Sequence, residues 1–196
     1  MVRFIEFFIS LFSLIILFPL FVIIGLLIKI NSKGPVLYKS ERAGKHGSIF
    51  TMYKFRTMVD NAKHNGPPVT SRDDPRITWT GRILRKTKMD ELPQLFNVLK
   101  GDMGFVGARP EDPEIVKSYH HMFRKILQYR PGITSPASIQ YRSEESLIPE
   151  DNWETVYIQD ILPRKIQLDT EYMKQAGFFK DIGVILRTVG IGKKQV

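Results

Sequence analysis

The sequence contains no cysteine, which excludes disulfide bonds, thiolate nucleophiles and thiolate-bound metals. Internal repeats and low-complexity runs are also absent, and 196 residues suffice for one domain with a sizeable core. Acidic residues are few beside basic ones, 20 against 29, and the net charge of +9 favours an anionic partner. Lipid headgroups, phosphorylated substrates and nucleic acid all fit this charge. Nucleic acid is disfavoured because the cations follow an apolar segment and no recognised nucleic-acid-binding motif is present.

The apolar segment carries no charge over residues 7–28, which is enough for a helix to cross a hydrocarbon core about 30 Å thick. A cleavable signal peptide is the alternative, but its apolar part usually covers only ~7–15 residues, and no small-residue cleavage pattern follows here. The basic residues after the segment begin with Lys29 and Lys33, and such cations mark the cytoplasmic side of a membrane segment. The rest of the chain is therefore expected on the cytoplasmic face.

Pro19 interrupts this apolar segment. A proline removes one helical hydrogen bond and clashes with the preceding turn, so a kink is expected near Phe18. At about 1.5 Å per residue, neither arm alone would cross a bilayer. A kinked spanning helix and a helical hairpin that enters and leaves on one face both stay open, and Arg3 on the other flank favours the hairpin.

The next part of the chain predicts a β-hairpin. Residues 36–39 and 49–55 are rich in β-branched and aromatic residues and flank a Gly-Lys-His-Gly turn. This turn lacks the spacing of a phosphate-binding loop and does not open a helix. Lys54 and Arg56 alternate with aromatic residues and would share one face of the second strand. They form either a solvated cationic face or a pair of cations directed at phosphate or lipid headgroups.

Two further segments are amphipathic. Residues 60–76 are polar and predict a loop, after which apolar and basic residues alternate over residues 77–88, a pattern suited to a membrane interface. Residues 178–191 combine apolar side chains with scattered charges and predict a helix that lies on the membrane or covers the core.

Asp90 and Glu91 precede a proline and a short helical run over residues 94–100. Acidic residues at a helix start can cap free N–H groups and complement the helix dipole, which is one interpretation of this pair. The other is chemical: neighbouring cations should keep both carboxylates ionised, so that either can bind a metal or attack phosphorus. Adjacent helical residues point about 100° apart, so the two carboxylates would serve different tasks.

A glycine-rich stretch, residues 101–107, follows and should leave backbone N–H groups free to approach an anion. Arg109 comes directly after it, placed for bidentate phosphate binding. Further on, residues 113–130 predict one helix with an apolar face, in which the adjacent His120 and His121 diverge and cannot chelate together. Residues 152–175 predict two helical pieces broken at Pro163.

The run KTKMDELPQLFNVLKGDMGFVGARPE closely resembles the bacterial sugar transferase family, the monotopic phosphoglycosyl transferases. The resemblance extends to KGPVLYKSERAGKHGSIFTMYKFRTM, DPRITWTGRILRKT, YRPGIT and LDTEYMKQAGFFKDIGVILRTV, and so covers nearly the whole chain. It departs from the family where Ala108 replaces the first proline of Pro-Arg-Pro, and where Ser135-Pro136 follows Gly-Ile-Thr. Neither departure touches the acidic pair.

The resemblance implies transfer of a phospho-sugar from a UDP-sugar to a polyprenol phosphate, with release of UMP. It implies that Asp90 is the nucleophile of a covalent intermediate and a Mg²⁺ ligand, that Glu91 assists deprotonation of the acceptor, and that Arg109 binds phosphate. The other side chains expected to bind substrate or phosphate are Lys54, Arg56, Arg85 and Pro110. The family's membrane segment is a broken re-entrant helix with both ends cytoplasmic.

The expected fold is a small α+β, membrane-associated domain. Residues 1–30 would form the re-entrant membrane helix, and residues 31–196 the cytoplasmic catalytic domain with a short β-hairpin and interfacial amphipathic helices. The expected partners are the UDP-sugar, the polyprenol phosphate and membrane phospholipid, at the cytoplasmic face of the bacterial inner membrane. A homodimer stays open as the assembly. The rival functions are a membrane-anchored protein that binds anionic lipid and a membrane phosphohydrolase.

Overall fold

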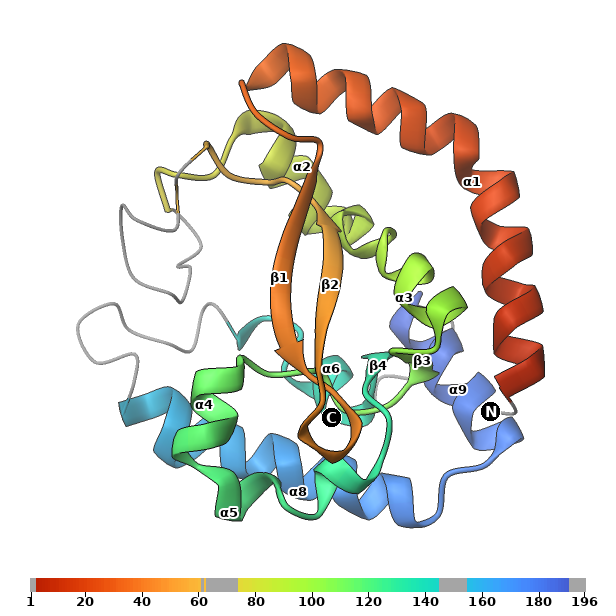
Figure 1. The fold of residues 1–196 in the computed structure, drawn as a ribbon, viewed down its shortest axis with the longest axis vertical. Coiled ribbons are helices and arrows are strands. Elements are labelled where there is room, and N and C mark those ends of the chain that lie inside the picture. Colours follow the sequence, from red (N-terminus) through yellow and green to blue (C-terminus); the bar gives the residue numbers. More distant parts are fainter. Residues whose placement is uncertain (1–2, 61, 63–73, 145–154, 191–196) are drawn as a thin grey trace.

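The computed structural model describes residues 3–60, 62, 74–144 and 155–190. It mixes helices with two small sheets, which confirms the helix-and-sheet class predicted from the sequence (Figure 1). In chain order the labelled elements are α1 (Arg3–Asn31), β1 (Leu37–Ala43), β2 (Ile49–Phe55), α2 (Trp79–Thr87), α3 (Gln94–Lys100), β3 (Gly104–Val106), α4 (Pro113–Ser118), α5 (His120–Phe123), β4 (Gly132–Thr134), α6 (Pro136–Gln140), α8 (Leu162–Lys174) and α9 (Phe178–Thr188).

Helix α1 is continuous, and Figure 1 shows that it bends midway into two arms of different direction. Pro19 lies inside the helix, where its missing N–H and its ring account for the bend. The most apolar window of α1 has a mean hydropathy of 3.1, and the helix is long enough to cross a membrane. The predicted kink is therefore present, within one bent helix.

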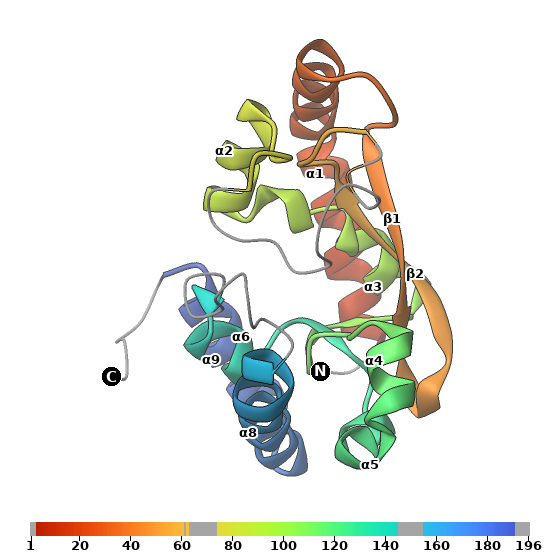
Figure 2. The same cartoon turned by 90° about the vertical axis from the view of Figure 1, so that its left-hand side faces the viewer.

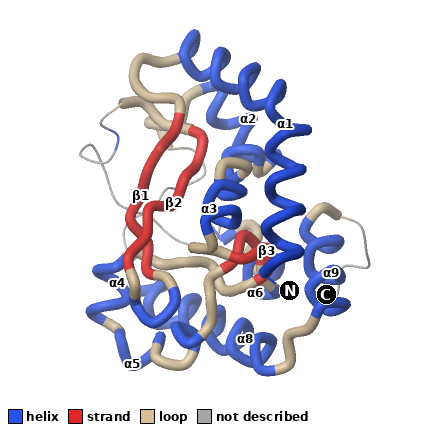
Figure 3. Tube along the Cα trace, turned by 45° about the vertical axis from the view of Figure 1, so that its right-hand side comes forward, coloured by secondary structure: helices blue, strands red, loops and turns tan. Residues whose placement is uncertain are grey.

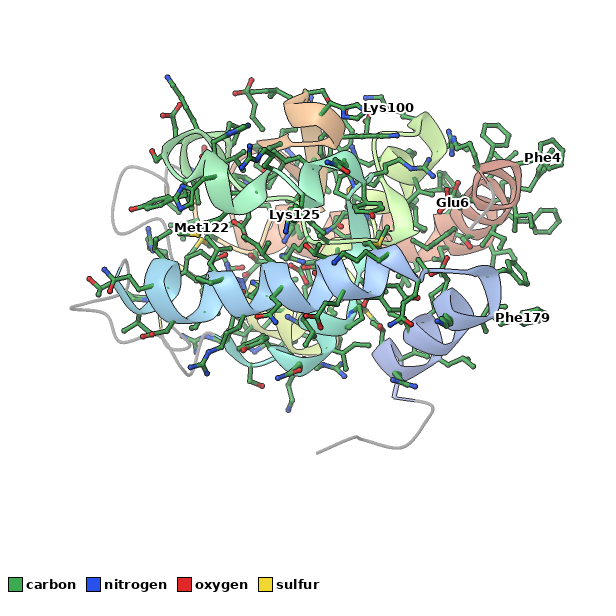
Figure 4. The ribbon with its side chains drawn as sticks, turned by 90° about the horizontal axis from the view of Figure 1, so that it is seen from below. Phe4, Glu6, Lys100, Met122, Lys125 and Phe179 are labelled. Carbon is green, nitrogen blue, oxygen red and sulfur yellow. The ribbon has the colours of Figure 1, made fainter. Side chains whose placement is uncertain are left out.

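The start of α1 is held by polar contacts with the rest of the fold. The Arg3 guanidinium donates to the carbonyl oxygens of Val98 and Leu99, both at 2.6 Å, at the C-terminal end of α3. Glu6, which is only 2% exposed, accepts a hydrogen bond from Arg130 Nη2 at 2.8 Å. Figure 4 shows Glu6 directed into the body of the molecule.

The second arm of α1 is held by apolar packing. Ile24 and Ile28 are buried in one cluster with Phe55 of β2 and Leu84 of α2. Just after the helix, the carbonyl and hydroxyl oxygens of Ser32 both accept hydrogen bonds from Nη2 of Arg56, the residue that follows β2. Both ends of α1 are thus attached to the same body.

Strands β1 and β2 form the predicted antiparallel hairpin, with Leu37 opposite Phe55 and Ala43 opposite Ile49. Its turn carries the short 3₁₀ helix Lys45–Gly47. Figure 2 shows this ribbon along one edge of the molecule, with its turn end reaching the region of α4 and α5.

Helix α3 lies between α1 and the hairpin (Figure 3). The Asn97 side chain fastens it to β2, because its Oδ1 accepts from the Tyr53 N–H at 3.1 Å and its Nδ2 donates to the Thr51 carbonyl at 2.6 Å. Lys54 lies between Met52 and Phe55 in the sequence of β2. Met52 is buried in one apolar cluster and Phe55 in another. The segment before α3 is therefore held at a fixed distance from Lys54.

Two predictions about later helices are wrong in detail. Residues 113–130 form α4, α5 and the 3₁₀ helix Ile126–Gln128 in place of one helix, because Tyr119 adopts a non-helical conformation between α4 and α5. The helix is also not broken at Pro163, because the π-helical turn Val156–Ile161 runs directly into α8, where Pro163 occupies the tolerated first turn. Most of the predicted loop at residues 60–76 lies outside the described residues.

Candidate active site

The acidic pair lies in a tight turn between α2 and α3. Lys88 ends α2 in the left-handed conformation, with φ of 59°, and the chain then forms the 3₁₀ helix Met89–Glu91. Pro93 precedes α3 with helical torsion angles, and no side chain makes a cap hydrogen bond there. Capping of α3, the structural role considered for Asp90 and Glu91, is therefore not what the described residues show.

Glu91 binds two cations from distant parts of the chain. Its Oε1 accepts from Lys54 Nζ at 3.2 Å and from Arg109 Nη2 at 2.8 Å, and its Oε2 accepts from Arg109 Nη1 at 3.3 Å. Burial of Glu91 disfavours its charged form, but Arg109 and then Lys54 outweigh that effect and hold the pKa of Glu91 well below its usual range. Glu91 is therefore ionised, as predicted.

The two cations respond in opposite ways to this environment. Burial, followed by the charge of Arg109, lowers the pKa of Lys54 despite its contact with Glu91. The charge of Glu91 raises the pKa of Arg109 above its ordinary value. Arg109 thus remains a fixed cation that currently forks onto a carboxylate, the geometry that also binds a phosphate group.

Asp90 has different surroundings. It is only 8% exposed, and among the described residues its Oδ1 has no hydrogen-bond partner. Burial is the main cause that raises the pKa of Asp90, against the opposing charge of Lys54. The cations predicted to keep this carboxylate ionised are present, but burial outweighs them. A buried carboxylate oxygen without a partner is costly for the fold, and such exceptions call for a functional explanation.

Arg85 and Arg56 complete the predicted cations. Arg85 donates through Nε to Thr57 Oγ1 at 3.0 Å, and its charge reaches Asp90. Arg56 does not join Lys54, because it follows the end of β2 and its Nη2 donates to the carbonyl and hydroxyl oxygens of Ser32 at 2.8 and 3.0 Å. The structure therefore brings Lys54, Arg109 and Glu91 into contact and places Arg56 at the end of α1.

The N–H groups of Gly104 and Gly107 in the glycine-rich stretch are not free, which corrects the prediction made for these glycines. The Gly104 N–H donates to the Pro131 carbonyl at 2.8 Å, and the Gly107 N–H donates to the Thr134 carbonyl at 3.0 Å. Strands β3 and β4 pair in parallel here, and a Cβ at Gly107 would lie 2.6 Å from the Arg130 carbonyl oxygen. The glycines allow two backbones to approach each other and fix the position of the nearby Arg109.

Pro110 is buried and lines a cavity of about 40 Å³ beside Arg109, together with Lys165 and Asp169. Asp169 accepts a hydrogen bond from the Ala137 N–H at 3.0 Å, and its burial raises the pKa of Asp169 to about 6. Asp169 therefore supports the start of α6.

The site also contains polar groups that sequence reasoning missed. The Tyr157 hydroxyl donates a hydrogen bond to Glu111 Oε1 at 2.5 Å, and Glu111 directly follows Arg109 and Pro110 in the chain. Gln94, at the start of α3, is 1% exposed, and its Nε2 has no hydrogen-bond partner among the described residues. Gln94 could have been noticed because it follows Asp90 by one helical turn.

The residues present fit one kind of metal site. Among the described residues, no group of three or more His, Asp or Glu side chains could hold an ion. Asp90 Oδ1 supplies one available carboxylate oxygen. Proteins commonly bind Mg²⁺ through one or two carboxylates plus waters and substrate phosphates, so the site fits a Mg²⁺ ion that arrives with a phosphorylated substrate.

A family model described as bacterial sugar transferase matches residues 1–195. The chain is 36% identical over 187 residues to an undecaprenyl-phosphate glucose phosphotransferase of Komagataeibacter xylinus, which covers 92% of this chain and 33% of that protein. It is 34% identical over 176 residues to a UDP-N-acetylgalactosamine-undecaprenyl-phosphate N-acetylgalactosaminephosphotransferase of Aeromonas hydrophila. This match covers 87% of this chain and 38% of that protein. It is 40% identical over 177 residues to an uncharacterized sugar transferase of Bacillus subtilis, covering 90% and 77%. The chain thus spans little more than a third of the first two relatives.

Proposed function

Because this chain belongs to the bacterial sugar transferase family, we propose that it transfers a phospho-sugar from a UDP-sugar to undecaprenyl phosphate or a similar polyprenol phosphate. The names of two relatives support the acceptor, and one of these names also supports the UDP-sugar donor. The observation that carries the proposal is the buried Asp90 carboxylate, whose Oδ1 is unpartnered beside a cluster of cations.

Asp90 is the nucleophile in this reaction. Its Oδ1 attacks the phosphorus that bears the sugar, the bond from this phosphorus to the oxygen of UMP breaks, and UMP leaves with that oxygen. The phospho-sugar is then held on Asp90 as a mixed anhydride. An oxygen of the polyprenol phosphate attacks the same phosphorus, which releases the Asp90 carboxylate and gives the polyprenyl-diphosphate-sugar.

Glu91 acts as the base that assists the acceptor. While Arg109 and Lys54 both contact Glu91, its lowered pKa makes it a poor base. The diphosphate of the donor competes for the same two cations, because it offers Arg109 a second bidentate partner. When these cations turn to the donor, the pKa of Glu91 rises toward its ordinary value, so donor binding prepares the base.

Mg²⁺ would be held by Asp90 together with the phosphates of the donor, and it would supply neutralisation of the diphosphate charge. The remaining steps depend on the chain's own residues. Lys54 and Arg109 bind the phosphate oxygens, Arg85 adds positive charge near Asp90, and Pro110 limits the motion of the Arg109 loop. Arg56 is buried at the end of α1, where it holds Ser32.

The membrane arrangement belongs to the same proposal. α1 enters the cytoplasmic leaflet of the inner membrane and returns to the same face, since both of its ends contact one body. Phe4 and Phe179 both project outward at the same end of the molecule (Figure 4) and would reach the lipid. A site at the interface allows the polyprenol to stay in the lipid while the nucleotide-sugar arrives from water.

The test uses the full chain in lipid nanodiscs with undecaprenyl phosphate, Mg²⁺ and a panel of UDP-sugars. We expect UMP release from one donor or a small set of donors, and a hydroxylamine-sensitive sugar label on the protein before acceptor is added. Asp90→Asn should lose the label and UMP release. Binding to anionic vesicles with no UMP from any donor would point instead to a lipid-binding protein, and phosphate release without acceptor would point to a phosphohydrolase.

A further inference from the structure

Two buried polar atoms near the turn into α3 lack partners. Asp90 Oδ1 is an acceptor and Gln94 Nε2 is a donor, and neither has a hydrogen-bond partner among the described residues. Both side chains are more than nine-tenths buried, at 8% and 1% exposure. Buried polar groups are nearly always paired, so two unpaired atoms this close in the chain indicate a group that joins them during function.

Asp90 and Gln94 belong to one short helical path. The chain is helical through the 3₁₀ helix Met89–Glu91, through Leu92 and Pro93, and into α3. The hydrogen bonds along this path join residues three apart, so Gln94 follows Asp90 by little more than one helical turn. Yet Gln94 does not bond to Asp90, although glutamine and aspartate at this spacing are able to do so.

A phosphoryl group satisfies both atoms at once. Its phosphorus is an electrophile for Asp90 Oδ1, and its non-bridging oxygens accept from an amide N–H. We propose that Gln94 is a further catalytic residue, whose Nε2 donates to a non-bridging oxygen of the phosphoryl group while Asp90 attacks the phosphorus. This inference rests on the proposed function.

A neutral donor has an advantage at this position. A lysine or arginine here would pair with Asp90 and lower the reactivity of its carboxylate. The Gln94 amide carries no charge, so it stabilises negative charge that develops on phosphorus without neutralising the nucleophile. Lys54 and Arg109 bind phosphate oxygens as charges in the proposed reaction, and the Gln94 amide adds a neutral donor next to the nucleophile.

The test replaces Gln94 by methionine, which keeps the length of the side chain and removes its donor. We expect Gln94→Met to slow formation of the covalent sugar label by about 100-fold, the effect of removing one donor to a developing oxyanion. The loss should fall on kcat, with the KM for the UDP-sugar within about threefold of wild type, because a donor used in the transition state affects the rate more than binding.

Gln94→Glu provides a second, independent readout. Its carboxylate cannot donate and repels phosphate, whereas its protonated form can donate. The labelling rate of Gln94→Glu relative to wild type should therefore rise as the pH falls from about 8 to about 6, provided that the buried carboxyl has a raised pKa. A ratio that stays flat across this range would contradict the proposal.

The controls separate catalysis from folding. Gln167→Met changes the same residue type on the exposed face of α8 and should label at the wild-type rate. If Gln94→Met labels at the wild-type rate, or if its lost rate matches a lost folded fraction in thermal unfolding, Gln94 only stabilises the fold through a bridging water. If the wild-type chain itself releases no UMP from any donor, the proposed function fails, an outcome distinct from failure of the Gln94 variants alone.

Discussion

Asp90 and Glu91 are adjacent in the chain, yet their surroundings shift their pKa values in opposite directions. Burial raises the pKa of Asp90, whereas Arg109 and Lys54 lower that of Glu91 despite its burial. Pairs of titratable groups whose environments separate their pKa values commonly divide the tasks of a reaction. At the scale of single residues, this difference supports the proposal that Asp90 is the nucleophile and that the basicity of Glu91 depends on its cations.

Asp90→Asn should make the folded protein more stable while it abolishes activity. The pKa of Asp90 is raised in the folded state, so its ionised form lowers the free energy of unfolding above that pKa. This penalty is removed as the pH falls through the folded pKa. Removing one buried unpaired charge should raise stability by about 1 kcal/mol, or about 2–4 °C in unfolding temperature. Thermal unfolding in nanodiscs at pH 7.5 measures this gain, which should shrink at acidic pH. A lower unfolding temperature for Asp90→Asn would contradict the assignment.

Glu91→Gln should have the opposite effect on stability. Because the pKa of Glu91 is lowered in the folded state, its charged form adds to the free energy of unfolding above its ordinary pKa of 4.5. This added stability is lost as the pH falls through the folded pKa. Removing the charge leaves Lys54 and Arg109 uncompensated, at 18% and 30% side-chain exposure, and should cost about 2–3 kcal/mol.

The measurement for Glu91→Gln is chemical unfolding at several pH values. The difference from wild type should be constant between about pH 6 and pH 8 and should diminish below the ordinary pKa of 4.5. The matched control is Glu171→Gln on the exposed face of α8, which should change stability by less than about 0.5 kcal/mol. Equal stability of Glu91→Gln and wild type at pH 7 would show that the pair with Arg109 does not hold the site together.

At the scale of elements, the sequence predicted local structure better than pairing. The β-hairpin, the amphipathic helices and the bend at Pro19 follow from composition and spacing within one segment. The parallel pairing of β3 with β4 was missed because each strand is only 3 residues long and gives no periodic signal. The glycines of residues 101–107 were accordingly interpreted as an anion loop, although the close approach of β4 is the reason for Gly107.

The site shows the same limit. Asp90, Glu91, Arg109 and Lys54 could be selected from their charge and from the resemblance, but not the contacts between them. Lys54 meets Glu91 only because Asn97 fastens α3 to β2, and that bond depends on the tertiary fold. Likewise, only the structure shows that Arg109 forks onto Glu91.

Gly107→Ala should disrupt the β3–β4 pairing and with it the position of Arg109. The new Cβ would lie 2.6 Å from the Arg130 carbonyl oxygen and 2.8 Å from the Gly132 nitrogen, both backbone atoms that cannot rotate away. We expect a loss of about 3 kcal/mol in unfolding free energy and loss of UMP release.

Gly183→Ala in α9 is the matched control for this substitution. Among the described residues, no atom comes within 4 Å of a Cβ at Gly183, and alanine should stabilise the helix by about 0.5–1 kcal/mol. Chemical unfolding of both variants measures the contrast. Similar unfolding curves for the two variants would show that the β3–β4 contact is not required.

At the scale of the whole molecule, the apolar helix α1 and the rest of the fold form one unit. Arg3 donates to the last carbonyl oxygens of α3, the helix that begins just after the acidic pair. The other arm of α1 packs on Phe55 of β2, next to Lys54 in the chain. A helix that crossed the bilayer would have its two ends on opposite sides, about 30 Å apart along the normal, and could not keep both sets of contacts to one body.

Cysteine labelling tests this topology directly, because the chain has no native cysteine and each introduced one is unique. A membrane-impermeant maleimide should label neither Val2→Cys nor Lys45→Cys in intact cells, and should label both in inverted membrane vesicles. Lys45, exposed in the hairpin turn, is the control for the cytoplasmic side. Labelling of Val2→Cys from outside the cell, with Lys45→Cys still protected, would establish a spanning helix. It would also mean that Arg3 and Glu6 leave Val98, Leu99 and Arg130 when the protein enters the membrane.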